Sequence, residues 1–259
     1  MPRMSATAPL ALPPPPPVQS DWALFLDVDG CLLDFADAPE AVVVPEGLAD
    51  ALARLSRALG GALAFVSGRR IVQLDALFAP LRFPSAGLHG LELREAADLA
   101  HVPDAAPEAL RQARDAAERI AAGYPGARVE DKGIAIALHW RAAPAARASL
   151  EATAAAALAQ LPGYRLQYGN CVVELRPAHA DKGQAVQRLM GATPFAGRLP
   201  VYAGDDLTDE DAFAATNALG GVSVRIGHRE PTYATHTLAD TAALRAWLSE
   251  AAARLGARA

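Results

Sequence analysis

The stretch that decides the fold is WALFLDVDG, residues 22–30. Its first five residues are apolar without alternation, which is typical of a strand buried on both faces of a sheet. Two carboxylates, Asp27 and Asp29, follow at once. Carboxylates in that position are costly unless they hold a cation or share a proton. The stretch therefore predicts a central strand with a chemical site at its carboxyl end.

Two later runs repeat this pattern. Residues 62–66 are apolar and lead into Ser67, and residues 199–203 are apolar and lead through a glycine into Asp205. Leucines at helical spacing between residues 48 and 59 predict an amphipathic helix between the first two strands. Alternation of strands and helices indicates an α/β fold with a doubly wound, Rossmann-like parallel sheet. In such sheets ligands bind beyond the carboxyl ends of the strands, so we expect these polar residues to converge.

The middle of the chain has a different pattern. Residues 134–141 alternate between apolar and mixed side chains, which is typical of a sheet with one packed face and one open face. We therefore expect residues 95–178 to form an inserted α+β cap domain, and residues 21–94 and 179–259 to form the parallel-sheet core. Further expected elements are helices over 106–122, 144–160 and 241–255, a hairpin over 164–176 that turns at Gly169 and Asn170, and a core strand over 222–226.

The first twenty residues contain five consecutive prolines, Pro13 to Pro17. Such a run favours polyproline II and is unsuited to a packed core, so we expect residues 1–20 to be a disordered tail. A ligand for an SH3-type domain is the alternative. The apolar run before the prolines is too short for a signal peptide, and we expect a cytoplasmic protein.

Composition excludes several classes of protein. The 259 residues carry a formal charge of 24 − 29 = −5, which lacks the basic patch that nucleic-acid binding needs. No apolar run approaches the length of a membrane span, about 18–20 residues. Two cysteines, Cys31 and Cys171, cannot form a disulfide scaffold or a four-thiolate zinc site. Composition leaves a globular α/β protein with a sizeable core, and we expect it to be a monomer.

An acidic cluster follows the strand over 199–203. Asp205, Asp206 and Asp209 lie within five residues, and the expected topology brings Asp27 and Asp29 to the same edge. Oxygen-rich clusters suit hard cations, and Mg²⁺ is usually held by one or two carboxylates with water and substrate phosphate. Zinc does not fit, because paired Cys or His ligands are missing from the sequence. The alternative is a set of acidic residues that cap helices.

Three other residues fit a phosphoryl group. Ser67 and Gly68 stand at a helix start, and Lys182 begins another helix. A hydroxyl, free backbone amides and a lysine charge are what a phosphoryl dianion needs. The alternatives are a helix N-cap for Ser67 and a solvated surface side chain for Lys182.

Six ordered motifs make the chain recognisable. They are VSGR (66–69), GLHG (87–90), EDKG (130–133) with His139, CVVE (171–174), DKG (181–183) and GDDLTDE (204–210). Together with DVDG (27–30), they resemble the trehalose-6-phosphate phosphatases, a family of the haloacid dehalogenase-like phosphatases. The resemblance extends from about residue 22 to about residue 247. It implies a Mg²⁺-dependent phosphatase that releases trehalose and phosphate from trehalose 6-phosphate in the last step of trehalose biosynthesis.

The resemblance also implies a role for each core residue. Asp27 would attack phosphorus and form an aspartyl-phosphate, and Asp29 would protonate the leaving sugar oxygen and then activate water. Mg²⁺ would be coordinated by the carboxylates of Asp27 and Asp205 and by the backbone carbonyl of Asp29. Asp206 and Asp209 would support this metal site. The phosphate would be bound by Ser67, Gly68 and Lys182. One departure is Cys31, which stands where the family usually has threonine. We expect it to tune the enzyme and to be open to oxidation.

The cap is expected to select the sugar. Glu130 and Lys132 are two residues apart and can point the same way, and Glu174 lies on another cap strand. The pattern alone also fits a solvated sheet face, whereas the resemblance implies sugar binding by these three residues and by His89. Two rivals stay open: a sister sugar phosphatase or phosphomutase of the same fold, and a catalytically silent sugar-phosphate sensor.

Overall fold

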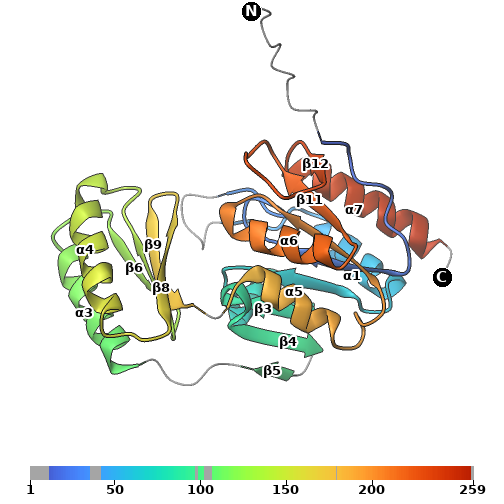
Figure 1. Cartoon of the computed structure of the whole chain (residues 1–259). Coiled ribbons are helices and arrows are strands. Elements are labelled where there is room, and N and C mark those ends of the chain that lie inside the picture. Colours follow the sequence, from blue (N-terminus) through green and yellow to red (C-terminus); the bar gives the residue numbers. More distant parts are fainter. Residues whose placement is uncertain (1–11, 36–41, 97–98, 102–106, 179, 258–259) are drawn as a thin grey trace, which may run out of the picture.

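The computed structural model describes residues 12–35, 42–96, 99–101, 107–178 and 180–257. In this part of the chain the strands form two sheets, one of eight strands and one of four. Figure 1 shows the smaller sheet and its two helices set to one side of the larger unit. The α/β core with an inserted cap is confirmed.

The core sheet has the order β12-β11-β10-β1-β2-β3-β4-β5. The pairs from β12 to β3 are all parallel, and β4 and β5 join one edge antiparallel. The bounds are β1 Trp22–Leu26, β2 Leu63–Val66, β3 Ser85–Gly87, β4 Glu92–Ala96, β5 Leu99–His101, β10 Leu199–Gly204, β11 Val222–Ile226 and β12 His236–Leu238. Every residue of β1 is buried, as an apolar run between two helix layers requires.

Helices cover this sheet in packed pairs. Helix α1 (Leu48–Ala58) packs against α7 (Thr241–Gly256), and α5 (Lys182–Met190) packs against α6 (Glu210–Ala218). In Figure 1, α5 and α6 lie in front of the sheet. The predicted leucine stripe of α1 is buried in the core cluster. Shorter core helices are α2 (Ile71–Leu77), η2 (Leu88–Gly90) and η4 (Leu207–Asp209).

The cap has its own core. Its sheet has the order β6-β7-β9-β8, with all pairs antiparallel. The bounds are β6 Arg128–Asp131, β7 Ile136–His139, β8 Tyr164–Gly169 and β9 Val172–Pro177, with helices α3 (Glu108–Ala121), η3 (Pro144–Ala146) and α4 (Arg147–Leu158). Ile136, Leu138 and Trp140 pack against these helices, as the alternation predicts. The opposite face carries Ala137, which is buried between its strand partners Glu130 and Glu174, and the half-buried His139.

Two boundaries in this region differ from the sequence prediction. Strands β4 and β5 extend the core sheet, so the antiparallel cap sheet begins well after residue 95. The hairpin turns at Asn170 and Cys171, because Gly169 pairs directly with Val172. Cys171 takes a left-handed backbone, with φ of 62°. Both differences come from short strands or turns whose register depends on their neighbours.

The prediction of a disordered tail is wrong for residues 12–20, and residues 1–11 lie outside the described part. Val18 is fully buried in the core cluster. The indole nitrogen of Trp247 donates to the carbonyl of Pro16 at 3.1 Å, and the amide of Thr237 donates to that of Pro13 at 2.9 Å. The carbonyls of a polyproline segment make no hydrogen bonds within the segment. Here a side chain of α7 and a backbone amide of the edge strand β12 donate to them.

Among the described residues, no helix combines the length and the apolar character needed to cross a membrane.

Candidate active site

The carboxyl ends of the core strands bring distant polar residues together. Asp27 follows β1, Ser67 follows β2 and Asp205 follows β10, and these three strands are neighbours. Gly30 makes the approach possible, because a Cβ there would lie 2.4 Å from Oδ2 of Asp205. Its φ of 79° is also a conformation that favours glycine. The predicted convergence at this edge of the sheet is therefore observed.

Lys182 lies in the centre of this group. Its side chain is 2% exposed, and Nζ lies 3.0 Å from Oδ1 of Asp27 and 2.7 Å from Oδ1 of Asp209. Asp181 caps the helix that carries it, accepting a bond from the amide of Gln184 at 2.8 Å. Burial alone would lower the pKa of Lys182, but Asp209 and Asp27 raise it well above its usual value. The reading as a solvated surface lysine is wrong.

Asp209 is fully buried and fully hydrogen-bonded. Oδ1 accepts from Lys182 and, at 2.6 Å, from the hydroxyl of Tyr202. Oδ2 accepts from the backbone amides of Asp205 and Asp206, each at 2.9 Å. Gly204 leaves room for this carboxylate, since a Cβ there would lie 2.2 Å from it. Asp209 therefore shapes the loop that carries the other acidic residues.

Carboxylate oxygens of Asp27, Asp205 and Asp209 lie within 4.8 Å of one another. Burial raises the pKa of Asp27 well above its usual value, with further contributions from Asp209 and Asp205. Burial, then Asp209 and Asp206, raise the pKa of Asp205 to about 8. Oδ1 of Asp205 is buried and has no hydrogen-bond partner among the described residues. One lysine does not neutralise these charges, and a divalent cation would.

Asp206 has a different environment from its neighbours. Its carboxylate accepts from the amide of Thr208 at 2.7 Å and from its hydroxyl at 2.6 Å. Burial acts to raise its pKa, but Lys182 and Thr208 hold it below the usual value. Asp206 thus caps the start of η4, as the alternative interpretation of the acidic residues predicts. Its charge also interacts with Lys182.

The environment of Ser67 fits both a helix N-cap and a phosphate-binding residue. Its hydroxyl accepts from the amide of Arg69 at 3.2 Å, as in a helix cap. Its backbone carbonyl accepts from the amide of His89 at 2.9 Å, and its own amide donates to the carbonyl of Ala86 at 2.9 Å. The Ser67 side chain is 1% exposed and lies beside Gly68, so the loop is held from two sides. Such a rigid loop of amides and hydroxyl suits an oxyanion.

Arg69 is a site residue that the sequence analysis did not single out. Its Nε and Nη2 donate to the two oxygens of Asp29, at 2.7 and 2.6 Å. This two-point contact fixes the plane of the Asp29 carboxylate, which is 30% exposed beside the buried Asp27. Arg69 follows Ser67 and Gly68 directly in the sequence. This position in the motif is the feature from which a role at the site could have been predicted.

The cap reaches the loop of Ser67 and Gly68 through Lys132. Its Nζ lies 3.4 Å from the backbone oxygen of Gly68 and 3.5 Å from Oε2 of Glu174. Burial acts to raise the pKa of Glu174, but Lys132 and His89 hold it far below its usual value. Oε1 of Glu174 is buried without a hydrogen-bond partner in the described chain. A charged group with a free acceptor thus faces the core site.

His89 lies at the boundary between core and cap. Its Nε2 is 3.7 Å from Oε2 of Glu174, and its ring lies so close to Gly68 that a Cβ there would meet it at 2.9 Å. Leu88 and His89 both have left-handed backbones, with φ of 50° and 56°. Burial lowers the pKa of His89 to about 4, although Glu174 acts in the opposite direction. The neutral ring therefore stands between Gly68 of the core and Glu174 of the cap.

Glu130 has a partner from the neighbouring cap strand. Oε2 lies 3.1 Å from Nε2 of His139. Burial acts to raise its pKa, while His139 and Lys132 lower it, and the net shift is downward. The register of β6, β7 and β9 places Glu130 and Glu174 on one face of the cap sheet, and Lys132 approaches that face through Glu174.

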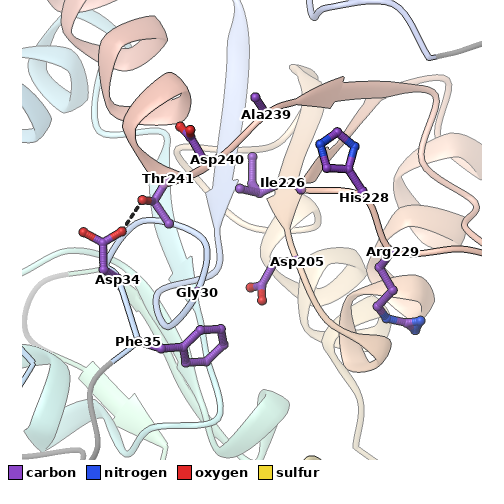
Figure 2. A pocket seen from close by; sticks show the side chains of 11 residues that line it. Gly30, Asp34, Phe35, Asp205, Ile226, His228, Arg229, Ala239, Asp240 and Thr241 are labelled. Carbon is purple, nitrogen blue, oxygen red and sulfur yellow. Dashed lines mark hydrogen bonds between the residues drawn. The ribbon is translucent and has the colours of Figure 1, made fainter.

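A cavity of about 360 Å³ opens beside Asp205. Figure 2 shows its lining, in which the carboxylate of Asp205 stands between Phe35 and Ile226. Thr241 donates to Asp34 on the far wall. The lining residues all come from the core, so this cavity gives solvent access to the acidic cluster and is separate from the cap residues.

The expected oxidation of Cys31 does not fit its environment. Its side chain is fully buried, and burial and Asp27 raise the pKa of its thiol well above the usual value. Thiolate character and exposure control oxidation, and Cys31 has neither. The structure brings the predicted site residues together, and their chemical roles stay predictions.

Comparisons with known proteins agree with this geometry. The family model described as trehalose-phosphatase matches residues 25–242. A protein of Sinorhizobium fredii named "Probable trehalose-phosphate phosphatase" is 48% identical, covering 82% of this chain and 80% of that protein. The "Trehalose-6-phosphate phosphatase" of Escherichia coli is 43% identical over 90% of this chain and 87% of its own.

Solved structures share the fold. One is described as a trehalose-6-phosphate phosphatase related protein. It superposes with a TM-score of 0.71 at 25% identity, covering 91% of this chain and 98% of that one. The C-terminal domain of the Candida albicans trehalose-6-phosphate phosphatase superposes with a TM-score of 0.74 at 21% identity, over 90% and 92% of the two chains.

Proposed function

The chain belongs to the trehalose-phosphatase family and is a phosphoric monoester hydrolase, and from this premise we propose its substrate and mechanism. The substrate is trehalose 6-phosphate, the products are trehalose and phosphate, and the reaction uses Mg²⁺ and an aspartyl-phosphate on Asp27. A cytoplasmic location and a monomeric state stay predictions.

One observation carries this proposal: Lys132 of the cap lies 3.4 Å from the backbone oxygen of Gly68 in the phosphate loop. The same ammonium lies 3.5 Å from Glu174, whose second oxygen has no partner among the described residues. Sugar-binding groups and phosphate-binding groups therefore meet at one point. A sugar phosphate, with hydroxyls on one side and a dianion on the other, has the matching chemistry.

Asp27 and Asp205 fit a Mg²⁺ ion. Their oxygens belong to one cluster, and Oδ1 of Asp205 is buried without a partner in the described residues. Asp209 belongs to the cluster too, but its oxygens are already used by Lys182, Tyr202 and two amides. We therefore assign it a supporting role. Bound Mg²⁺ would offset the charge of the phosphoryl group and the nucleophile.

The side chains of this chain then divide the reaction. The Asp27 carboxylate attacks phosphorus in line, and the bond from phosphorus to the sugar oxygen breaks. Asp29 gives its proton to that oxygen, and later takes a proton from the water that releases phosphate from Asp27. Lys182 and Ser67 hold the phosphoryl oxygens throughout. Arg69 donates to both oxygens of Asp29, so one of these bonds loosens when Asp29 carries the proton, while the other keeps the orientation of the group.

Phosphate release from a panel of sugar phosphates, with Mg²⁺ and with chelator, tests the proposal. We expect trehalose 6-phosphate to give the highest kcat/KM and chelator to remove activity. Preference for another sugar phosphate would favour a sister phosphatase of the same fold, because the core groups cannot tell one sugar from another. Tight binding of a sugar phosphate without turnover would indicate a sensor.

A further inference from the structure

Tyr202 carries a hydroxyl in the middle of the core sheet. It lies in β10, its side chain is fully buried, and its ring packs edge-on against Phe213 with centroids 5.7 Å apart. A phenylalanine would fill the same space and avoid the cost of burying a polar group. The one hydrogen bond of this hydroxyl within the described chain goes to Oδ1 of Asp209, at 2.6 Å.

The oxygen that Tyr202 contacts is the one that holds Lys182. Nζ of Lys182 lies 2.7 Å from Oδ1 of Asp209 and 3.0 Å from Oδ1 of Asp27. The other oxygen of Asp209 is held by two backbone amides and cannot turn towards the lysine. The hydroxyl and the ammonium therefore share a single acceptor whose position is fixed.

Sharing that acceptor changes what Lys182 can do. A proton donated to Oδ1 offsets part of its negative charge, which weakens the hold of Asp209 on the ammonium. The ammonium then stays available to Asp27 and to a phosphoryl oxygen. Burial, followed by Asp209, raises the pKa of Tyr202 well above its usual value, so the hydroxyl keeps the proton that it donates.

We propose that Tyr202 is a positioning residue for phosphoryl transfer, which uses its buried hydroxyl on Asp209 to keep Lys182 directed at Asp27 and the phosphoryl group. The proposal rests on the phosphatase function above and adds to it a residue that does not touch substrate. This role explains why a tyrosine stands at a buried, otherwise apolar position of β10, just before the loop of Asp205 and Asp206.

The test is Tyr202→Phe, which keeps the ring and removes the hydroxyl. Hydrogen bonds to charged groups are stronger than those between neutral groups, and part of that strength acts on Lys182. We expect kcat to fall about tenfold with KM changing much less, and inorganic phosphate to bind several-fold more weakly to the Mg²⁺-loaded protein by calorimetry. Unchanged kcat and phosphate affinity in a folded variant would overturn the proposal.

One control variant, Phe213→Leu, separates positioning from general loosening of the core. Phe213→Leu weakens the same ring cluster without touching Asp209, so we expect it to lower stability in urea and to leave kcat nearly unchanged. If it lowers kcat as much as Tyr202→Phe does, or if Tyr202→Phe fails to fold, the hydroxyl is a structural group and the proposal is wrong.

A double-mutant cycle on phosphate affinity tests whether Tyr202 acts through Lys182. If Tyr202 acts through Lys182, then Tyr202→Phe has little further effect on phosphate binding in a Lys182→Met background. Equal effects in both backgrounds would contradict that route. The cycle uses inorganic phosphate, and turnover is also measured on an aryl phosphate. A failure of the trehalose assignment would therefore appear in the wild-type sugar panel and leave this test readable.

Discussion

The core and the cap hold their polar side chains in opposite ways. In the core, Asp209 uses both oxygens in four hydrogen bonds, all of them 2.6–2.9 Å long. In the cap, Lys132 and Glu174 approach each other only to 3.5 Å, and Oε1 of Glu174 has no partner in the described residues. Asp209 is therefore a fixed part of the core that holds Lys182 and the acidic loop in place, whereas Glu174 keeps an open acceptor for a ligand, as Oδ1 of Asp205 does for a cation in the core.

The strongest test of this contrast is Asp27→Asn. It removes the attacking charge and one carboxylate of the acidic cluster while keeping the side-chain shape. We expect turnover to fall at least about a thousandfold, equally for trehalose 6-phosphate and for an aryl phosphate, because the core serves both. Asp50→Asn, at an exposed position in the first turn of α1, is the matched control. Residual activity of one tenth in Asp27→Asn would contradict the covalent mechanism.

Removal of the metal should also act on the core alone. We expect chelator to abolish phosphate release from both substrates, Mg²⁺ to restore it, and Ca²⁺ to inhibit. Ca²⁺ takes longer bonds and more ligands than Mg²⁺, which would displace Asp27 from in-line geometry. Phosphate release is measured after dialysis against chelator and after addition of each ion. Full activity in chelator would contradict the metal assignment, because Lys182 alone would then offset the negative charge of Asp27, Asp205 and Asp209.

Substitutions in the cap should separate the two substrates. Replacing Glu130, Lys132 or Glu174 by alanine removes charged hydrogen bonds worth roughly 1.5–3 kcal/mol each. We expect kcat/KM for trehalose 6-phosphate to fall about ten- to a hundredfold, and that for a small aryl phosphate to fall much less. Glu118→Ala, on the exposed face of α3, is the control for charge on the cap. Equal losses on both substrates would place these residues in the fold or the core site.

How far the sequence predicts this molecule also differs between the two regions. The strands of the core and the residues that end them could be predicted, because burial on both faces leaves an apolar run and a polar stop. Strands β4 and β5 could not, since they are short and join the sheet edge only through tertiary pairing. The contact of Arg69 with Asp29 spans forty positions and leaves no local pattern. The segment over 12–20 was misread because its stability comes from its partners in α7.

A pH experiment tests the boundary between the two regions. Unfolded His89 takes up a proton near its ordinary pKa of 6.5, whereas burial lowers the pKa in the folded protein to about 4. Between these values the unfolded state binds more protons, so the free energy of unfolding falls as the pH drops. Between pH 7 and pH 5 we expect a loss of up to about 2 kcal/mol from this group.

Urea titrations at several pH values measure this loss. His89→Gln should remove the His89 contribution, so that the wild-type slope minus the variant slope is positive over this window, and His228→Gln, at an exposed position of the core, should leave the slope unchanged. Asp205, whose pKa is raised to about 8, gives a slope of the opposite sign in both proteins and cancels in this difference. The window lies above the ordinary pKa of 4.5 of Glu174, whose own titration therefore contributes little there. The same slope in wild type and His89→Gln would mean that His89 is protonated as readily in the folded chain as in the unfolded one.

The smallest expected effect concerns Cys31, one residue beyond the tight approach of Gly30 to Asp205. Its thiol is fully buried and its pKa is raised by burial and by Asp27, so it should behave as a small apolar side chain. We expect Cys31→Thr to change kcat by less than about threefold, because the backbone around Asp27 is unaffected. In the folded protein, iodoacetamide should label Cys171 in the cap turn well before Cys31, and mass spectrometry of the labelled peptides distinguishes the two. Rapid labelling of Cys31 under native conditions would mean that the core opens as easily as the cap, which would remove the contrast between a fixed core site and an adaptable cap.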